Sequence, residues 1–262
     1  HIRRIPYDAT TVNRVLEKRE KLCYTFTMNK GIIIAGKDFP ETRVFVKAAS
    51  ANGFSVITSL ADESAQIPAE PVNGFVWQKA SPVSARSFVF EAQTALPKLT
   101  HALLIFDTLS YINKIHLRDS QSLSSGIDDL IASYMHITRE ILGRFAILGG
   151  GTLCFVFKPY LENAKFGARK EAVSPSQAFV LAAASAFKTF AEQTALSDAF
   201  ASGIDFLLCE EDPVAENDGE TADFVFSALS AAETSKSGGK KQSARWLRAG
   251  SKFSVGWNLF SR

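Results

Sequence analysis

Residues 31–58 read GIIIAGKDFPETRVFVKAASANGFSVIT. The apolar run Ile32–Ala35 predicts a buried strand that ends at Gly36. Asp38-Phe-Pro-Glu41 then predicts the start of a helix, because a capping residue is followed three positions later by Glu and a proline lies near the first turn. The helix stops at Asn52-Gly53, and a second apolar strand follows. This order of strand, helix and strand is a βαβ unit, which implies a parallel sheet.

The same alternation continues along the chain. The unbroken apolar run Thr152–Phe157 is typical of a strand covered on both faces, so it belongs at the centre of the sheet. We predict an α/β fold: a Rossmann-like, doubly wound parallel sheet in three layers, α/β/α. Beyond residue 58 the expected strands are 74–77, 102–106, 152–157, 204–209 and 253–257, and the expected helices are 82–96, 127–145, 176–196 and 220–233.

The composition is that of a soluble globular protein. The chain has 262 residues, 46% of them hydrophobic, and a net charge of +2 from 29 basic and 27 acidic residues. This balance favours neither nucleic acid nor an anionic membrane as a partner. The apolar runs are shorter than the roughly 18 residues that a membrane span requires. Three distant cysteines, Cys23, Cys154 and Cys209, suit a reduced compartment. We therefore expect a cytoplasmic protein.

The domain organisation is simple. We expect residues 28–262 to form one domain, because Met28 lies just before the first strong strand. Residues 1–27 are predicted to be a helical arm or an appended segment, which is either native or foreign to the domain.

The order and spacing of these elements are similar to the short-chain dehydrogenases/reductases over about residues 30–257. Three segments carry the likeness: Gly31–Gly53 resembles the first βαβ turn, Gly149–Phe157 the central strand, and Gly203–Pro213 the sixth strand and its exit. The resemblance implies a dinucleotide-binding fold, in which a glycine-rich turn lets the cofactor pyrophosphate approach a helix N-terminus.

The cofactor turn departs from the family pattern. Gly36 matches, but Phe39 and Thr42 lie where later glycines are expected. Asp38 and Glu41 place negative charge where the resemblance puts the pyrophosphate. The degenerate cofactor positions are Gly36, Lys37 and Asp38, and we predict no cofactor.

The catalytic residues that the resemblance implies are also missing. The family uses a Tyr acid with a Lys four residues later on one helix face. None of the five tyrosines has such a lysine, and the matching helix positions fall at Gln177 and Leu181. The catalytic Ser position falls at or near Lys158, and the helix Asn position near Leu130. The family's Asn-Asn-Ala-Gly turn corresponds to Phe106–Leu109. We predict no catalytic residue.

Within that family the chain resembles the non-catalytic N-terminal domain of long-form 3-oxoacyl-carrier-protein reductases. The shared features are the glycine-poor turn, the missing Tyr/Lys pair and the ending Phe253-Ser-Val-Gly256. In such proteins an active domain follows, whereas this sequence stops at Arg262. The resemblance implies a catalytic reductase, acyl-CoA or an acyl-carrier protein as partner.

Other polar clusters have plain interpretations. The three internal histidines, His101, His116 and His136, lack metal-ligand spacing, so no metal is predicted. Glu210–Asp212 is expected to be a solvated acidic loop, or else a contact for a cation or a basic partner. The one basic cluster is expected to be a solvated loop, or else a site for phosphate groups of an acyl carrier, coenzyme A or nucleic acid. It comprises Lys236, Lys240, Lys241, Arg245 and Arg248, with Trp246 nearby.

Two functions remain open from the sequence. The first is a non-catalytic structural or interaction module that associates with itself or with a catalytic partner through the helices 127–145 and 176–196. The second is a divergent NAD(P)-dependent oxidoreductase of the 3-oxoacyl thioester reductase type, with Lys37 or Lys158 in new roles. The first also predicts that Phe39, Phe106 and Leu109 fill the cofactor crevice. Its interface residues are predicted to be Leu130, Tyr134, Met135, Ile137, Ala183 and Phe187.

Overall fold

The computed structural model describes residues 30–63, 72–160, 173–197, 203–212, 217–234 and 244–248. The predicted arm 1–27, the predicted strand 253–257 and three lysines of the basic cluster lie outside these residues.

A seven-stranded parallel sheet with the order β3-β2-β1-β4-β5-β6-β7 forms the middle layer. The order reverses between β1 and β4, which are neighbours at the centre of the sheet. The prediction of a doubly wound parallel sheet is therefore confirmed. The strands are β1 (Lys30–Ala35), β2 (Phe54–Leu60), β3 (Val72–Val76), β4 (Leu99–Asp107), β5 (Gly151–Lys158), β6 (Ile204–Glu210) and β7 (Leu247–Arg248).

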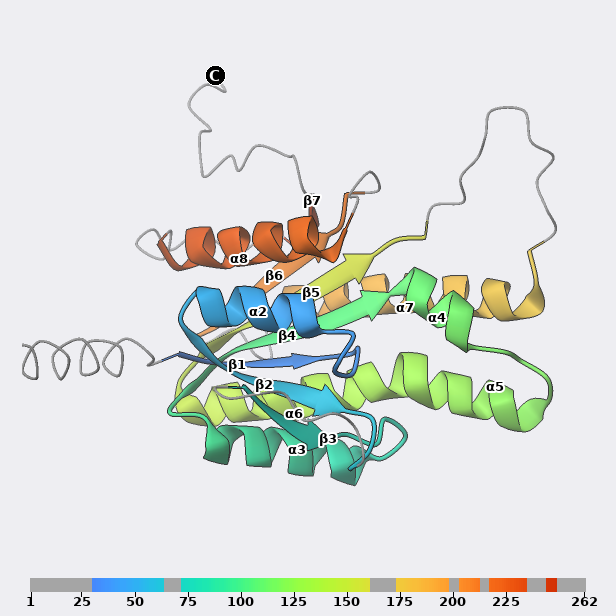
Figure 1. Cartoon of the computed structure of the whole chain (residues 1–262), viewed down its shortest axis with the longest axis horizontal. Helices are drawn as coiled ribbons and strands as arrows, with labels where there is room; N and C mark the ends of the chain where they lie inside the picture. Colours follow the sequence, from blue (N-terminus) through green and yellow to red (C-terminus); the bar gives the residue numbers. More distant parts are fainter. Residues whose placement is uncertain are drawn as a thin grey trace, which may run out of the picture.

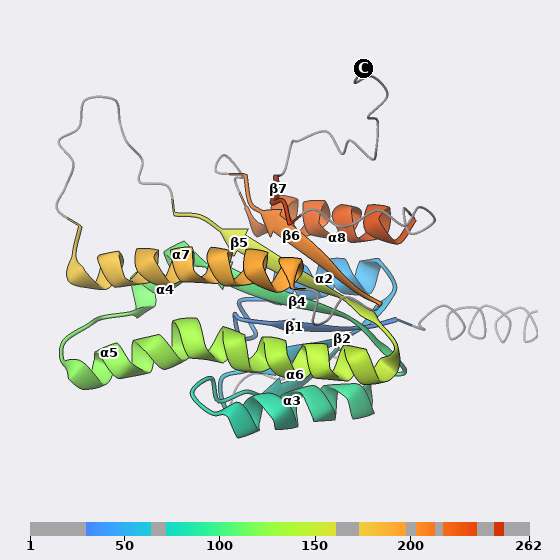
Figure 2. The ribbon, with the colours of Figure 1, turned by 180° about the vertical axis from the view of Figure 1, so that it is seen from behind.

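Helices cover both faces of the sheet (Figure 1). In Figure 2, α3, α6 and α7 lie together on one face, and α2 and α8 lie on the other. This arrangement confirms the three-layer prediction. The helices are α2 (Arg43–Ala51), α3 (Pro82–Ala95), α4 (Thr108–Lys114), α5 (Ser120–Ile127), α6 (Ser133–Leu148), α7 (Pro175–Leu196) and α8 (Asp218–Thr234), with a π-helical turn, η1 (Asp128–Ala132), between α5 and α6.

Each face of the sheet has its own hydrophobic core, as the alternation of side chains along a strand requires. On β4, Leu104 and Phe106 pack toward α3, α6 and α7, whereas Leu103 and Ile105 pack toward α2 and α8. All four side chains are fully buried. The central strands are therefore continuous apolar runs, and charged residues lie at their ends.

The predicted helix over 127–145 is part of a longer unit. It begins at α5, passes through η1 and continues as α6. It ends at Gly149, which adopts a left-handed conformation with φ 79°. A Cβ on the following Gly150 would lie 2.3 Å from Gly203 O, so the close approach of the two loops requires glycine.

Helix α4 was not predicted. It begins directly after β4, because the Asp107 side chain accepts a hydrogen bond from Ser110 N and so caps the helix. Among the described residues, no helix is both long enough and apolar enough to cross a membrane.

Candidate functional site

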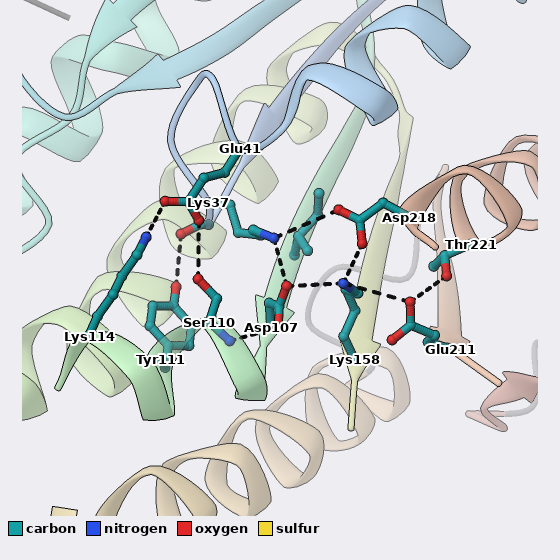
Figure 3. Close-up of polar contacts among 12 residues, drawn as sticks. Lys37, Glu41, Asp107, Ser110, Tyr111, Lys114, Lys158, Glu211, Asp218 and Thr221 are labelled. Atoms are coloured by element: carbon teal, nitrogen blue, oxygen red, sulfur yellow. Dashed lines mark hydrogen bonds and ion pairs between the residues drawn. The ribbon is translucent and has the colours of Figure 1, made fainter. Parts of the chain in front are cut away.

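The carboxyl ends of the parallel strands meet at one edge of the sheet. In open α/β sheets, ligands bind at this edge where the strand order reverses, here between β1 and β4. Three charged residues lie there: Lys37 follows β1, Asp107 ends β4 and Lys158 ends β5. Figure 3 shows them pointing toward one another.

The two lysines share one carboxylate oxygen. Lys37 Nζ lies 2.6 Å from Asp107 Oδ2, and Lys158 Nζ lies 3.0 Å from the same atom. The exposed fractions of the side chains are 8% for Lys37, 7% for Asp107 and 11% for Lys158. These ion pairs are buried. Removing one partner would leave the other charges buried with neither a counter-charge nor water to stabilise them.

Asp218, at the start of α8, and Glu211, directly after β6, complete the network. Asp218 Oδ1 lies 2.5 Å from Lys158 Nζ, and Asp218 Oδ2 lies 3.9 Å from Lys37 Nζ. Glu211 Oε1 is 3.7 Å from Lys158 Nζ and accepts a hydrogen bond of 2.5 Å from Thr221 Oγ1. The network thus joins the ends of four strands, β1, β4, β5 and β6, to the first turn of α8.

The charges of this network are mutually stabilised. Burial alone would raise the pKa of the Asp107 carboxyl, but Lys158 and Lys37 outweigh burial and hold the pKa below its ordinary value. Burial alone would lower the pKa of Lys158, yet the carboxylates of Asp107, Asp218 and Glu211 raise it above its ordinary value. At neutral pH, Asp107 is therefore ionised and Lys158 is protonated.

Glu211 differs from Asp107. Burial raises the pKa of its carboxyl above the ordinary value, and the hydrogen bond from Thr221 and the charge of Lys158 offset only part of that effect. The repulsion from Asp218 and Asp107 acts in the same direction as burial. The ionised form of Glu211 is therefore less favourable in the folded protein than in water.

Helix α4 holds the turn after β1. Lys114 forms an ion pair with Glu41, and Ser110 Oγ donates a hydrogen bond of 3.1 Å to Glu41 Oε2. The Tyr111 hydroxyl donates to Gly36 O over 2.8 Å. It also lies 2.8 Å from the hydroxyl of Tyr134, which donates to Ile105 O over 2.6 Å.

The predicted degenerate cofactor positions are all engaged within the chain. Gly36 has φ 104°, and a Cβ there would lie 2.2 Å from Ile105 O, so only glycine fits. Lys37 belongs to the network described above. Asp38 accepts a hydrogen bond of 2.8 Å from Ser59 Oγ and forms an ion pair of 2.9 Å with Lys79.

Two backbone donors of the same turn are also occupied. Phe39 N donates to Ser59 O over 2.8 Å, and Glu41 N donates to Asp38 O over 2.9 Å. Pro40, between them, has no N–H group. A dinucleotide pyrophosphate needs free N–H groups at this position. The residues of this turn therefore do not fit the pyrophosphate.

The three side chains predicted to fill the crevice differ in their burial. Phe39 is 7% exposed, and Phe106 is fully buried between the rings of Tyr111, Tyr134 and Phe187. The expectation for Leu109 is wrong, because its side chain is 50% exposed.

The predicted interface residues fall mostly inside the chain. Met135 is 43% exposed. The other five are at most 3% exposed and belong to the core on the α3, α6 and α7 face: Leu130, Tyr134, Ile137, Ala183 and Phe187.

The acidic and basic clusters partly neutralise each other. Glu210 is 7% exposed and accepts hydrogen bonds from Lys188 and Arg248, so the expectation of a solvated loop is wrong at this residue. Trp246 Nε1 donates to Glu192. Among the described residues, no group of three or more His, Cys, Asp or Glu side chains is placed to hold a metal ion.

The strand order and the helical layers on both faces of the sheet define a Rossmann-like protein. Among solved structures, the chain is similar to a short-chain dehydrogenase of Mycobacterium smegmatis, with a TM-score of 0.59 and 15% identity over 86% of this chain and 93% of that one. It is also similar to a short-chain dehydrogenase/reductase variant of Serratia marcescens, with a TM-score of 0.58 and 15% identity over 84% of this chain and 95% of that one. The enoyl-[acyl-carrier-protein] reductase (NADH) of Aquifex aeolicus gives a TM-score of 0.57 and 13% identity over 85% and 96%. The chain therefore has the fold of the short-chain dehydrogenases/reductases.

Comparison by sequence adds one relative. The chain is 26% identical over 226 residues to an uncharacterized protein of Treponema pallidum, which covers 85% of this chain and 94% of that protein. No protein-family model matches the chain.

Proposed function

We propose that this protein is a non-catalytic member of the short-chain dehydrogenase/reductase fold that acts as a structural or interaction module. One observation carries the proposal: the ion-pair network of Lys37, Asp107, Lys158 and Asp218 lies at the switch point, where enzymes of this fold hold their cofactor and reacting groups.

The network is poorly suited to proton transfer. General acid–base catalysis is most efficient when the pKa of the group lies near the working pH. The pKa of Asp107 is held below its ordinary value and that of Lys158 above it, so both groups keep their charges through the neutral range. Burial raises the pKa values of Tyr111 and Tyr134, whose hydroxyl groups hydrogen-bond to backbone carbonyls.

The helices on one face supply a surface for association. Leu123, Ile127 and Met135 are 40–43% exposed and follow one another along α5 and α6. Met135 also borders a shallow apolar cavity of about 10 Å³ between α6 and α7, which has room for about one water molecule. Exposed apolar patches of this kind favour a partner, either a second copy of the chain or a catalytic reductase.

Ligand binding tests the first half of the proposal. We expect that neither NADH, NADPH nor acetoacetyl-CoA changes the melting temperature, whereas an active reductase of the same fold responds in parallel. A ligand at about 100 times its dissociation constant would add roughly 2.7 kcal/mol to the stability. A clear rise in melting temperature with either nucleotide would contradict the proposal.

Association tests the second half. Light scattering at micromolar concentration is expected to show an oligomer, and Met135→Arg is expected to shift it toward the monomer. Val44→Arg is the matched control, because Val44 is 37% exposed on α2 at the opposite face. Equal effects of both variants, or a monomeric wild type that a catalytic reductase does not bind, would overturn the interface.

The second candidate function is a divergent NAD(P)-dependent oxidoreductase. Two lysines at the switch point favour it, because Lys158 lies at or near the family's catalytic Ser position and Lys37 lies in the cofactor turn. In this function a nucleotide phosphate would have to displace Asp218 from both lysines. The melting experiment above separates the two candidates.

A further inference from the structure

We propose that His101 carries a proton on both ring nitrogens in the folded protein and holds the last turn of α8 against the sheet through Glu233. This latch lies at the amino end of the strands, away from the network at their carboxyl ends. The proposal is independent of the proposed function.

The His101 ring is enclosed by four elements. It lies near the start of β4, is 4% exposed and packs edge-on against Phe54 of β2 at 4.9 Å between ring centroids. Its Nε2 lies 3.2 Å from Oε1 of Glu233, the second-to-last residue of α8. Lys30 Nζ of β1 lies 2.6 Å from the other oxygen of that carboxylate.

The hydrogen bonds of the Thr100 hydroxyl show that Nδ1 of His101 carries a proton. Thr100 Oγ1 donates its one proton to Gly31 O over 3.2 Å. Nδ1 of His101 lies 2.8 Å from Thr100 Oγ1, so the hydroxyl oxygen must accept and Nδ1 must donate. A neutral imidazole has one N–H, which this hydrogen bond already uses.

The second nitrogen then faces a carboxylate. If Nε2 were unprotonated, its lone pair would lie within 3.2 Å of an electron-rich oxygen of Glu233. Lys30 forms an ion pair with the same Glu233 carboxylate. This positive charge favours the ionised carboxylate over a protonated carboxyl group that would donate to Nε2. Protonation of Nε2 converts this repulsion into an ion pair.

The other charged groups near the ring leave this assignment intact. On the same face of the sheet, Thr152 of β5 pairs with His101, and Asp205 of β6 pairs with Thr152. Asp205 is thus two strands away from the ring, whereas the Glu233 carboxylate lies 3.2 Å from Nε2. The adjacent carboxylate favours a charged His101.

The stabilising effect of the latch depends on pH. A carboxylate at the C-terminal end of a helix is opposed by the helix dipole, so Glu233 depends on nearby cations. When His101 loses its proton, only Lys30 remains, and its side chain is 48% exposed and screened by water. The contribution of His101 to stability is thus present at acidic pH and is lost as the pH rises.

Nitrogen NMR of the histidine rings tests the proposal directly. In the full chain at about pH 6.5, the ordinary pKa of a histidine, we expect two protonated ring nitrogens for His101, and we expect this state to persist above that pH. Glu233→Gln should move the loss of the proton to a lower pH, while Glu91→Gln, an exposed change on α3, should not. A neutral His101 ring at that pH, or a titration unchanged by Glu233→Gln, would overturn the proposal.

Unfolding by urea gives the second measurement. Between about pH 5.5 and about pH 8, the folding equilibrium constant of the wild type should fall by about tenfold more than that of Glu233→Gln. Equal slopes for the two proteins would show that the contact is not a latch.

Discussion

Lys37, the residue after the turn glycine, and Asp107, the last residue of β4, form a buried ion pair of 2.6 Å across the point where the strand order of the sheet reverses. The carboxylate also accepts a hydrogen bond from Ser110 N and binds Lys158. A single side chain therefore connects two lysines, two strand ends and the start of α4.

Asp107→Ala should strongly destabilise the protein. It leaves two buried lysines without their shared partner, a loss of about 3–5 kcal/mol, and it removes the cap of α4, a further loss of about 1 kcal/mol. Urea unfolding measures the sum. Asp119→Ala is the matched control, because Asp119 caps α5 at the exposed surface and has no lysine partner among the contacts of its cap. A similar small loss in both variants would show that the ion pairs contribute little.

The network should also give the protein an acid-dependent stability. The pKa of Asp107 is lowered in the folded chain, so its stabilising effect is complete above the unfolded value of about 3.9 and is lost as the pH falls through the folded value. Asp107→Asn should flatten the loss of stability below about pH 4. The readout is the urea midpoint between about pH 2 and about pH 6, and parallel curves for both proteins would count against the network.

Glu211→Gln should change the stability in the opposite direction to the substitutions at Asp107. The pKa of Glu211 is raised, so its ionised form is disfavoured and the folded protein loses stability as the pH rises through that pKa. A glutamine keeps an oxygen for the Thr221 hydroxyl and removes the charge. We expect stability at neutral pH to be unchanged or higher by up to about 1 kcal/mol. A loss of more than about 2 kcal/mol would mean that the attraction to Lys158 dominates.

Gly36→Ala tests the close approach of β1 and β4. The new Cβ would lie 2.2 Å from Ile105 O at a φ of 104°, so the two strand ends must separate. Gly53→Ala isolates the cost of the left-handed backbone, because Gly53 has φ 80° and no atom within 4 Å of the new Cβ. We expect about 1–2 kcal/mol at Gly53 and clearly more at Gly36 in thermal or urea unfolding. Equal losses would place the whole effect in the backbone angle.

The fold was predictable because the buried strands are continuous apolar runs. The predicted strand 152–157 corresponds to β5 at Gly151–Lys158, and the predicted helix 176–196 corresponds to α7 at Pro175–Leu196. Helix α4 escaped prediction because it is short and its N-cap, Asp107, is the last residue of a strand. Its signal was present: Asp107 stands three residues before Ser110, as in an N-cap.

The candidate site was only partly predictable. Asp107 and Lys158 end two apolar runs with opposite charges, but only the strand order shows that β4 and β5 are neighbours. Asp218 comes from a helix 60 residues after Lys158, and no periodicity indicates this contact. The interface residues show a related difficulty. A helical apolar stripe identifies a buried face, yet Leu130 and Ala183 are buried by the chain's own core.

The absence of catalysis is tested by the reduction of acetoacetyl-CoA and longer 3-oxoacyl thioesters by NADPH or NADH, followed by the loss of nicotinamide absorbance. We expect no turnover above that of the unfolded protein, because the charges at the switch point are paired with each other and two backbone donors of the turn are occupied. Steady reduction that scales with the amount of protein and disappears in Lys158→Met would contradict this expectation.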